Sequence, residues 1–146
     1  MTREKKYPNT ETFFNYNANP KNRITGDCVT RAMCTAMEVP YNEVVMDIAR
    51  FNCETGYVAY YHEEKYLDTK GWVRHPQPRK ADNTKYTGKQ FCALLNKMSK
   101  TKSIGNVIAM IGCHHVVCIK PVLGKYKVHD TWDSSENCIG RWWTKE

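Results

Sequence analysis

The apolar residues of this 146-residue chain change their spacing in its last third, and this change constrains the fold more than any other feature. Earlier, apolar residues recur at the spacing of a helix face, which predicts helices over roughly 28–37, 41–52 and 87–98. Later come short β-rich runs, which predict strands over about 106–111, 115–119, 126–130 and 138–143. Helices followed by strands predict an α+β fold, with N-terminal helices packed on a C-terminal antiparallel sheet.

The first segment predicts an arm rather than a second domain. Residues 1–21 are polar and rich in Asn, Thr and Pro, with Phe13, Phe14 and Tyr16 as aromatic anchors. We expect this arm to lie over the surface, pinned by those aromatics. Residues 22–146 are long enough for one hydrophobic core and are expected to form a single domain.

The segment over 53–86 is the least informative part of the chain. Pro76 and Pro78 lie too close together for a regular helix, and we expect a loop that extends through Asn83. Long loops in compact domains are often functional. This segment is therefore where we expect the walls of a substrate cleft.

The lack of a recognisable targeting signal and the pattern of cysteines predict a cytoplasmic protein. No apolar run approaches the ~20 residues needed to span a bilayer, and no apolar segment follows the basic N-terminal residues as it would in a signal peptide. The seven cysteines are odd in number and irregularly spaced, which favours free thiols over a disulfide framework.

The chain is basic, with 22 Lys and Arg against 15 Asp and Glu and a formal charge of +7. A basic surface attracts anions, so an acidic protein or a nucleic acid is a candidate partner. The basic residues are scattered in small groups rather than gathered in one patch. Specific nucleic-acid binding is therefore not favoured.

Cys28 lies at the predicted start of the first helix, directly after a Gly-Asp turn. Backbone N–H groups at a helix start have no intrahelical partner, and the helix dipole is positive there. Both effects favour a thiolate, the nucleophilic form of cysteine. Cys28 is the candidate nucleophile, whereas Cys34, Cys53, Cys92 and Cys118 are expected to be inert core residues.

Cysteine catalysis also needs an imidazole and a polar group that orients it. His115 opens a predicted strand, and Asp130 ends the next one, beyond the hairpin turn signal Leu123-Gly124-Lys125. Antiparallel pairing should bring His115 and Asp130 opposite each other at the open end of the hairpin. Adjacent strand residues face opposite ways, and His115 is preferred over His114 because it directly precedes the apolar run.

In this order, the segments resemble those of the papain-like cysteine peptidases. Members of that family carry His-Ala-Val and Asn-Ser-Trp where this chain has His115-Val116-Val117 and Asp130-Thr131-Trp132. The stretches Gly-Asp-Cys-Val-Thr-Arg-Ala and His-Asp-Thr-Trp-Asp are also similar to small papain-like proteins encoded in bacteriophage genomes, which implies the host cytoplasm as location. The resemblance covers the first predicted helix and the last third of the chain.

The resemblance implies further roles. In the family an amide side chain six positions before the nucleophile helps to form the oxyanion hole with the nucleophile's backbone N–H, and here Asn22 occupies that position with a stem one methylene shorter than the usual glutamine. Trp132 would shield the His–Asp hydrogen bond from water. The chain departs from the family at Asp27, whose charge would oppose a thiolate unless it faces away or binds the arm. It also departs at Asp130, which replaces asparagine but can still accept from an imidazole N–H.

The expected function is that of a thiol-dependent hydrolase, a peptidase or isopeptidase that acts on a protein or peptide substrate. Its Cys-His-Asp triad would be Cys28, His115 and Asp130, with neither cofactor nor metal. Acyl transfer to an amine, as in transglutaminase-like relatives, would use the same residues. The alternative from a different class is a papain-like binding protein without turnover, directed at an acidic host protein or at nucleic acid.

A structural zinc site is the rival interpretation of the C-terminal region. Side chains of the type that zinc uses occur at Cys113, His114, Cys118, His129 and Cys138. The sequence has no Cys-x-x-Cys pair, and the spacing matches no common zinc finger. Zinc is therefore disfavoured.

Overall fold

The chain folds as a mixed α/β structure in which helices cover both faces of an open six-stranded sheet. The computed structural model describes residues 6–57 and 62–145. Its helices are α2 (Cys28–Met37), α3 (Tyr41–Thr55), α4 (His62–Thr69) and α5 (Gly88–Met98). Its strands are β1 (Phe13–Asn15), β2 (Trp72–His75), β3 (Val107–Ile111), β4 (His115–Val122), β5 (Lys125–Asp130) and β6 (Ile139–Lys145).

The three expected helices and the four late strands are confirmed. A capping box marks the start of α5, where the Thr87 side chain accepts from the backbone N–H of Gln90 and the Gln90 side chain accepts from the backbone N–H of Thr87. The helix α3 runs to Thr55, slightly beyond its expected end, and stops at Gly56 in the left-handed conformation. Of the helices in the described ranges, none combines the length and the apolar character required to cross a membrane.

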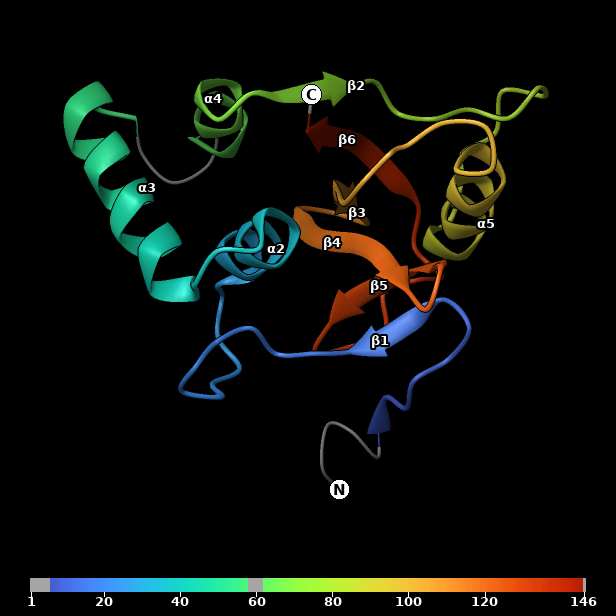
Figure 1. Cartoon of the computed structure of the whole chain (residues 1–146), viewed down its shortest axis with the longest axis horizontal. Coiled ribbons are helices and arrows are strands. Elements are labelled where there is room, and N and C mark those ends of the chain that lie inside the picture. The colour runs from blue at the N-terminus through green and yellow to red at the C-terminus, as the bar shows by residue number, and fades with distance from the viewer. Residues whose placement is uncertain (1–5, 58–61, 146) are drawn as a thin grey trace.

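The sheet has the strand order β1-β5-β4-β3-β6-β2 and includes two strands from the first half of the chain. The four expected C-terminal strands pair antiparallel, but at one edge β1 runs parallel to β5 (Figure 1), so the sheet as a whole is mixed. Part of the N-terminal arm therefore belongs to the sheet as β1, and its Phe13 side chain is fully buried in the core. At the other edge β2 pairs antiparallel with β6.

The loop expected to extend through Asn83 begins at Pro76, and the residues directly before it form a strand. Residues Trp72–His75 form β2, and Trp72 is buried while Arg74 is exposed. The strand ends immediately before Pro76, which cannot donate to a ladder of hydrogen bonds. The sequence therefore defined the end of this strand but not its existence.

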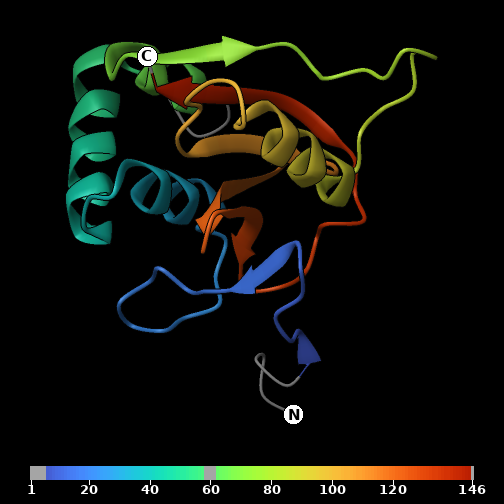
Figure 2. The ribbon, with the colours of Figure 1, turned by 45° about the vertical axis from the view of Figure 1, so that its right-hand side comes forward.

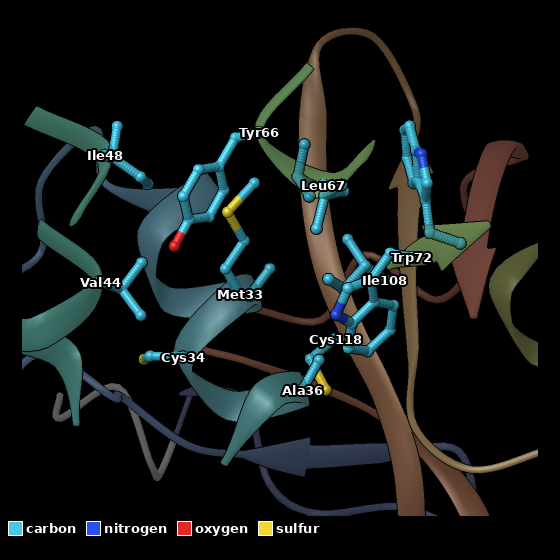
Figure 3. Close-up of a cluster of buried hydrophobic side chains, with 13 residues drawn as sticks. Met33, Cys34, Ala36, Val44, Ile48, Tyr66, Leu67, Trp72, Ile108 and Cys118 are labelled. Carbon is cyan, nitrogen blue, oxygen red and sulfur yellow. The ribbon is translucent and has the colours of Figure 1, made fainter. Parts of the chain in front are cut away.

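Two hydrophobic clusters lie on opposite faces of the sheet, with α2 on one side and α5 on the other (Figure 2). In the first cluster Met33 of α2 lies among side chains of α3, α4 and the sheet (Figure 3). In the second cluster Phe91 and Leu95 of α5 are fully buried. The helix α2 is therefore fixed along most of its length, which holds its first residue in place beside the sheet.

The β4–β5 hairpin determines where His115 and Asp130 lie. Both residues of the turn Leu123-Gly124 have positive φ, as a two-residue type I′ turn requires. The resulting register pairs Cys118 with His129. Asp130 follows His129 and therefore faces Val117, two residues from His115 on β4. It thus lies diagonal to His115 rather than directly opposite, as was expected. Diagonal neighbours on one face remain within reach of long side chains.

Candidate active site

Cys28 is the first residue of α2 and is half-buried. The His115 side chain and the backbone of Val116 lie close enough to its thiol to lower its pKa. The helix start adds unpaired N–H groups and the positive end of the dipole. The sulfur therefore lies between the start of a helix and the start of a strand, in surroundings that favour negative charge.

His115 joins Cys28 to Asp130. Its Nε2 lies 2.5 Å from Asp130 Oδ2, within hydrogen-bonding distance. Because Asp130 occupies Nε2, the ring nitrogen left to face the Cys28 thiol is Nδ1. The structure thus brings together the three expected triad residues, which come from α2, β4 and β5.

The contacts around the thiol and the imidazole favour an ion pair. Burial by itself raises the pKa of the Cys28 thiol, but the hydrogen bonds from His115 and Val116 and the positive charges nearby hold this pKa below its ordinary value. Burial by itself lowers the pKa of His115, but its hydrogen bonds to Asp130 and Cys28 outweigh burial and raise this pKa to about 9. Both shifts favour a thiolate beside an imidazolium.

The Asp130 carboxylate is buried and is held by three donors. Its Oδ1 accepts from Arg31 Nη1 at 2.6 Å and from the backbone N–H of Thr131 at 2.7 Å, and its Oδ2 faces His115. Burial alone would raise the pKa of Asp130, but these hydrogen bonds and the charge of His115 keep it below its ordinary range. Asp130 therefore stays ionised although it is only 1% exposed.

Arg31 is the residue of this site that the sequence reasoning missed. It lies one helical turn after Cys28, is 9% exposed, and bridges Asp27 and Asp130. The signal was an arginine within the apolar stripe of a helix, because a guanidinium is buried only when acidic partners receive it. Asp27, four residues earlier, was the partner that helical spacing offered.

Asp27 is engaged by groups other than the thiol. Its Oδ1 accepts from Arg31 Nε at 2.8 Å, and its Oδ2 accepts from the Tyr41 hydroxyl at 2.8 Å and from Asn19 Nδ2 at 3.0 Å. Asn19 belongs to the arm, so Asp27 binds the arm, which is one of the two arrangements expected to keep its charge from opposing the thiolate. The negative charge beside Cys28 is balanced by Arg31.

Aromatic and histidine neighbours separate into those at the site and those away from it. The Trp132 ring lies against His115, with ring centroids 5.0 Å apart, in keeping with the shielding role that the resemblance implies. His114 is exposed in the β3–β4 turn with φ 63°, and it is His115 that contacts Asp130. His129 packs against Phe14 with tilted rings, and burial lowers its pKa to about 4, so it acts as a neutral structural ring.

Asn22, the expected oxyanion donor, lies in the loop before α2. It is exposed, has φ 54°, and its Oδ1 accepts from Asn17 Nδ2 at 3.4 Å. Within the described part of the chain, no hydrogen bond links Asn22 to Cys28 or His115. Of the four expected site residues, the structure therefore links Cys28, His115 and Asp130 through their contacts, and Asn22 has its described side-chain contact within the loop before α2.

The remaining cysteines divide by burial rather than forming a metal site. Buried as expected are Cys34, Cys92 and Cys118. Cys53 is exposed, so its assignment to the core is wrong: it lies on the outer side of α3. Among the residues described by the structure, no three side chains of the metal-binding types come together, the five considered for zinc included.

The loop after Asp130 is anchored by the start of α5. The backbone N–H of Gly88 donates to Asn137 O and that of Lys89 donates to Ser135 O, each at 2.9 Å. These donors are among those that a helix start leaves unpaired. The helix on the far face of the sheet thus holds the loop that carries Trp132.

Replacing Gly88 with alanine should destabilise the protein. A Cβ at this position would lie 2.9 Å from Ser135 Cα and 3.0 Å from Ile111 Cδ1, so the loop backbone would have to move. We expect a loss of about 1–3 kcal/mol in the free energy of unfolding, measured by urea denaturation. Gly26→Ala is the matched control, because a Cβ there meets nothing within 4 Å. Equal stability of the two variants would contradict the anchoring role.

No protein-family model matches the chain, and no curated protein or solved structure matches it either. The functional interpretation consequently depends on the chemistry of the site. That chemistry is a thiol beside an imidazole that is hydrogen-bonded to a carboxylate, with an ion pair to Arg31 behind the carboxylate.

Proposed function

We propose that the protein is a papain-like, thiol-dependent hydrolase that cleaves peptide or isopeptide bonds. The observation that carries this proposal is the Cys28 thiol beside His115, whose Nε2 is hydrogen-bonded to the buried Asp130 carboxylate. Such an arrangement supplies a nucleophile, a proton carrier and an orienting group. All seven cysteines are free thiols, which fits a reducing compartment such as the cytoplasm.

In the first half of the reaction, the Cys28 thiolate attacks the carbonyl carbon of the substrate and a tetrahedral intermediate forms. The His115 imidazolium then donates its proton to the leaving nitrogen, the C–N bond breaks, and a thioester remains on Cys28. The helix start offers the backbone N–H of Cys28 as a donor to the oxyanion. Asn22 is proposed as the second donor, which requires the loop before α2 to turn its amide toward the substrate.

In the second half, His115 acts as the base. Loss of the thiolate removes one of the interactions that raise the pKa of His115, so the imidazole becomes neutral more readily in the thioester state. It takes a proton from water, the water oxygen attacks the thioester, and the acid leaves as the thiolate returns. A primary amine in place of water would give acyl transfer with the same residues.

Cys28 should be the fastest of the seven thiols to react with iodoacetamide at pH 6. A half-buried thiol is less accessible than the exposed Cys53, Cys113 and Cys138, so faster labelling would reflect its thiolate character and not its exposure. The measurement is site-resolved mass spectrometry over time. Cys28→Ser should remove the fast phase and leave the labelling of the exposed thiols unchanged.

Two outcomes would reject the proposal. Labelling of Cys28 at or below the rate of the exposed thiols would mean that the ion pair does not form. Fast labelling combined with no cleavage of a fluorogenic peptide pool, and no transfer to an added primary amine, would instead favour the binding protein without turnover. In that case a charge reversal at Arg79 and Lys80, one of the small basic groups in the sequence, should abolish binding to the acidic partner while Cys28→Ala leaves binding intact.

A further inference from the structure

A second buried ion pair lies directly behind the proposed triad. Arg31 reaches two carboxylates at once, with Nε 2.8 Å from Asp27 Oδ1 and Nη1 2.6 Å from Asp130 Oδ1. The side chains of Arg31, Asp27 and Asp130 are 10%, 11% and 1% exposed, respectively. Burying charges in this way costs desolvation energy, and an apolar side chain could fill the same helix face. Bond cleavage by a thiol, an imidazole and a carboxylate does not itself require the extra pair.

The donors around Asp130 are arranged so as to orient its carboxylate. The terminal torsion of an aspartate is broad, so burial alone does not fix the plane of the two oxygens. Arg31 and the backbone N–H of Thr131 both converge on Oδ1. These two hydrogen bonds to Oδ1 leave Oδ2 directed toward His115 Nε2, which lies 2.5 Å away. The direction of the imidazole therefore depends on what holds the opposite oxygen.

We propose that Arg31 is a positioning residue that fixes the Asp130 carboxylate, and through it the catalytic imidazole, while Asp27 holds the other edge of the guanidinium. This inference rests on the proposed function and concerns a residue that acts through its hydrogen bond to Asp130. It also accounts for the aspartate at position 130. With donors on both sides, both oxygens must accept, and the single oxygen of an asparagine amide cannot serve both.

The fork of the arginine and its charge have separable roles. A guanidinium presents donors in a rigid plane, so it can bridge two carboxylates, whereas a lysine ammonium is a point charge on a flexible stem. The charged groups facing the site alternate in sign: the Cys28 thiolate, the His115 imidazolium, Asp130, Arg31 and Asp27. The charge of Arg31 is also one of the causes that lower the pKa of the Cys28 thiol. Lysine should preserve the charge and lose the orientation.

The test uses p-nitrophenyl acetate, because its two reaction phases report on different groups. The burst of p-nitrophenolate needs no proton for the leaving group and measures the thiolate of Cys28. The steady state measures hydrolysis of the acetyl thioester, which needs the imidazole to be aimed at water. For Arg31→Lys we expect a burst rate within about threefold of wild type and deacylation slowed by about 10- to 100-fold. For Arg31→Met we expect both phases to slow, and the pH midpoint of iodoacetamide labelling to rise by about one unit.

Arg50→Met is the matched control, because Arg50 is an exposed arginine of α3 in an ion pair with Asp47, and both phases should stay unchanged. Wild-type deacylation in a folded Arg31→Lys variant would overturn the inference. If Arg31→Met does not fold, as judged by circular dichroism, the Arg31→Lys comparison still decides. Failure of the wild-type protein to give a burst would remove the proposed function, and this inference with it, whereas a wild-type burst with unaltered Arg31→Lys kinetics removes the inference alone.

Discussion

Replacing His115 with alanine is expected to slow turnover of a peptide or ester substrate by about 10³- to 10⁴-fold, because the variant loses both the acid of the first step and the base of the second. It should also raise the pKa of Cys28. The hydrogen bond and positive charge of His115 oppose the effect of burial on this thiol, and without them burial prevails. Rates of iodoacetamide labelling as a function of pH would therefore shift toward alkaline values.

The adjacent histidine provides the control for this experiment. His114 is exposed and lies in the left-handed region, which asparagine tolerates well, so His114→Asn should fold and retain activity and the labelling profile. A loss of activity in His114→Asn as large as that in His115→Ala would mean that the two histidines have been assigned the wrong way round.

The largest loss of stability is expected for Asp130→Ala. The substitution leaves Arg31 buried with Asp27 as its remaining carboxylate partner, and it removes the acceptor for His115 and for the Thr131 N–H. Breaking a buried ion pair from one side typically costs about 3–5 kcal/mol, and we expect a loss of this size in the free energy of unfolding. Urea denaturation at neutral pH measures it, and turnover should fall in parallel.

Asparagine at position 130 is the informative comparison. Asp130→Asn keeps the shape, but its amide can accept from Arg31 or from His115 and not from both, so we expect an intermediate loss of about 1–3 kcal/mol. Adding Arg31→Met removes the competing donor and should restore part of the turnover lost in Asp130→Asn. If Asp130→Ala is as stable as wild type, the carboxylate is not the centre of the buried network.

Local signals in the sequence account for what could be predicted. The capping residue Thr87, the turn Leu123-Gly124 and the apolar spacing of α2 each act within a few residues, and they defined helix starts, the hairpin and the position of Cys28. The approach of His115 to Asp130 followed from the hairpin, although their offset by one diagonal step did not, because register depends on the turn geometry.

Contacts between distant segments account for what was missed. Parallel pairing of β1 with β5 joins residues more than a hundred positions apart, and a three-residue strand carries little pattern of its own. Arg31 finds Asp130 across 99 positions of sequence, and only the fold brings the two together. The sequence showed that the charge of Asp27 would oppose a thiolate, but it did not predict the ion pair of Asp27 with Arg31. The partners of Asp27 lie on the arm, on α3 and one turn along α2.

The origin of the site in distant segments also affects the order in which a newly made chain acquires reactivity. Cys28 leaves the ribosome long before β4 and β5 exist, and until then its sulfur has neither His115 nor Asp130 beside it. The backbone N–H of Tyr16, which donates to Asp130 O at 2.8 Å, must likewise wait for the end of β5. During synthesis His115 is thus absent from the thiol, and it can lower the pKa of Cys28 only after the late strands have paired with the earlier part of the chain.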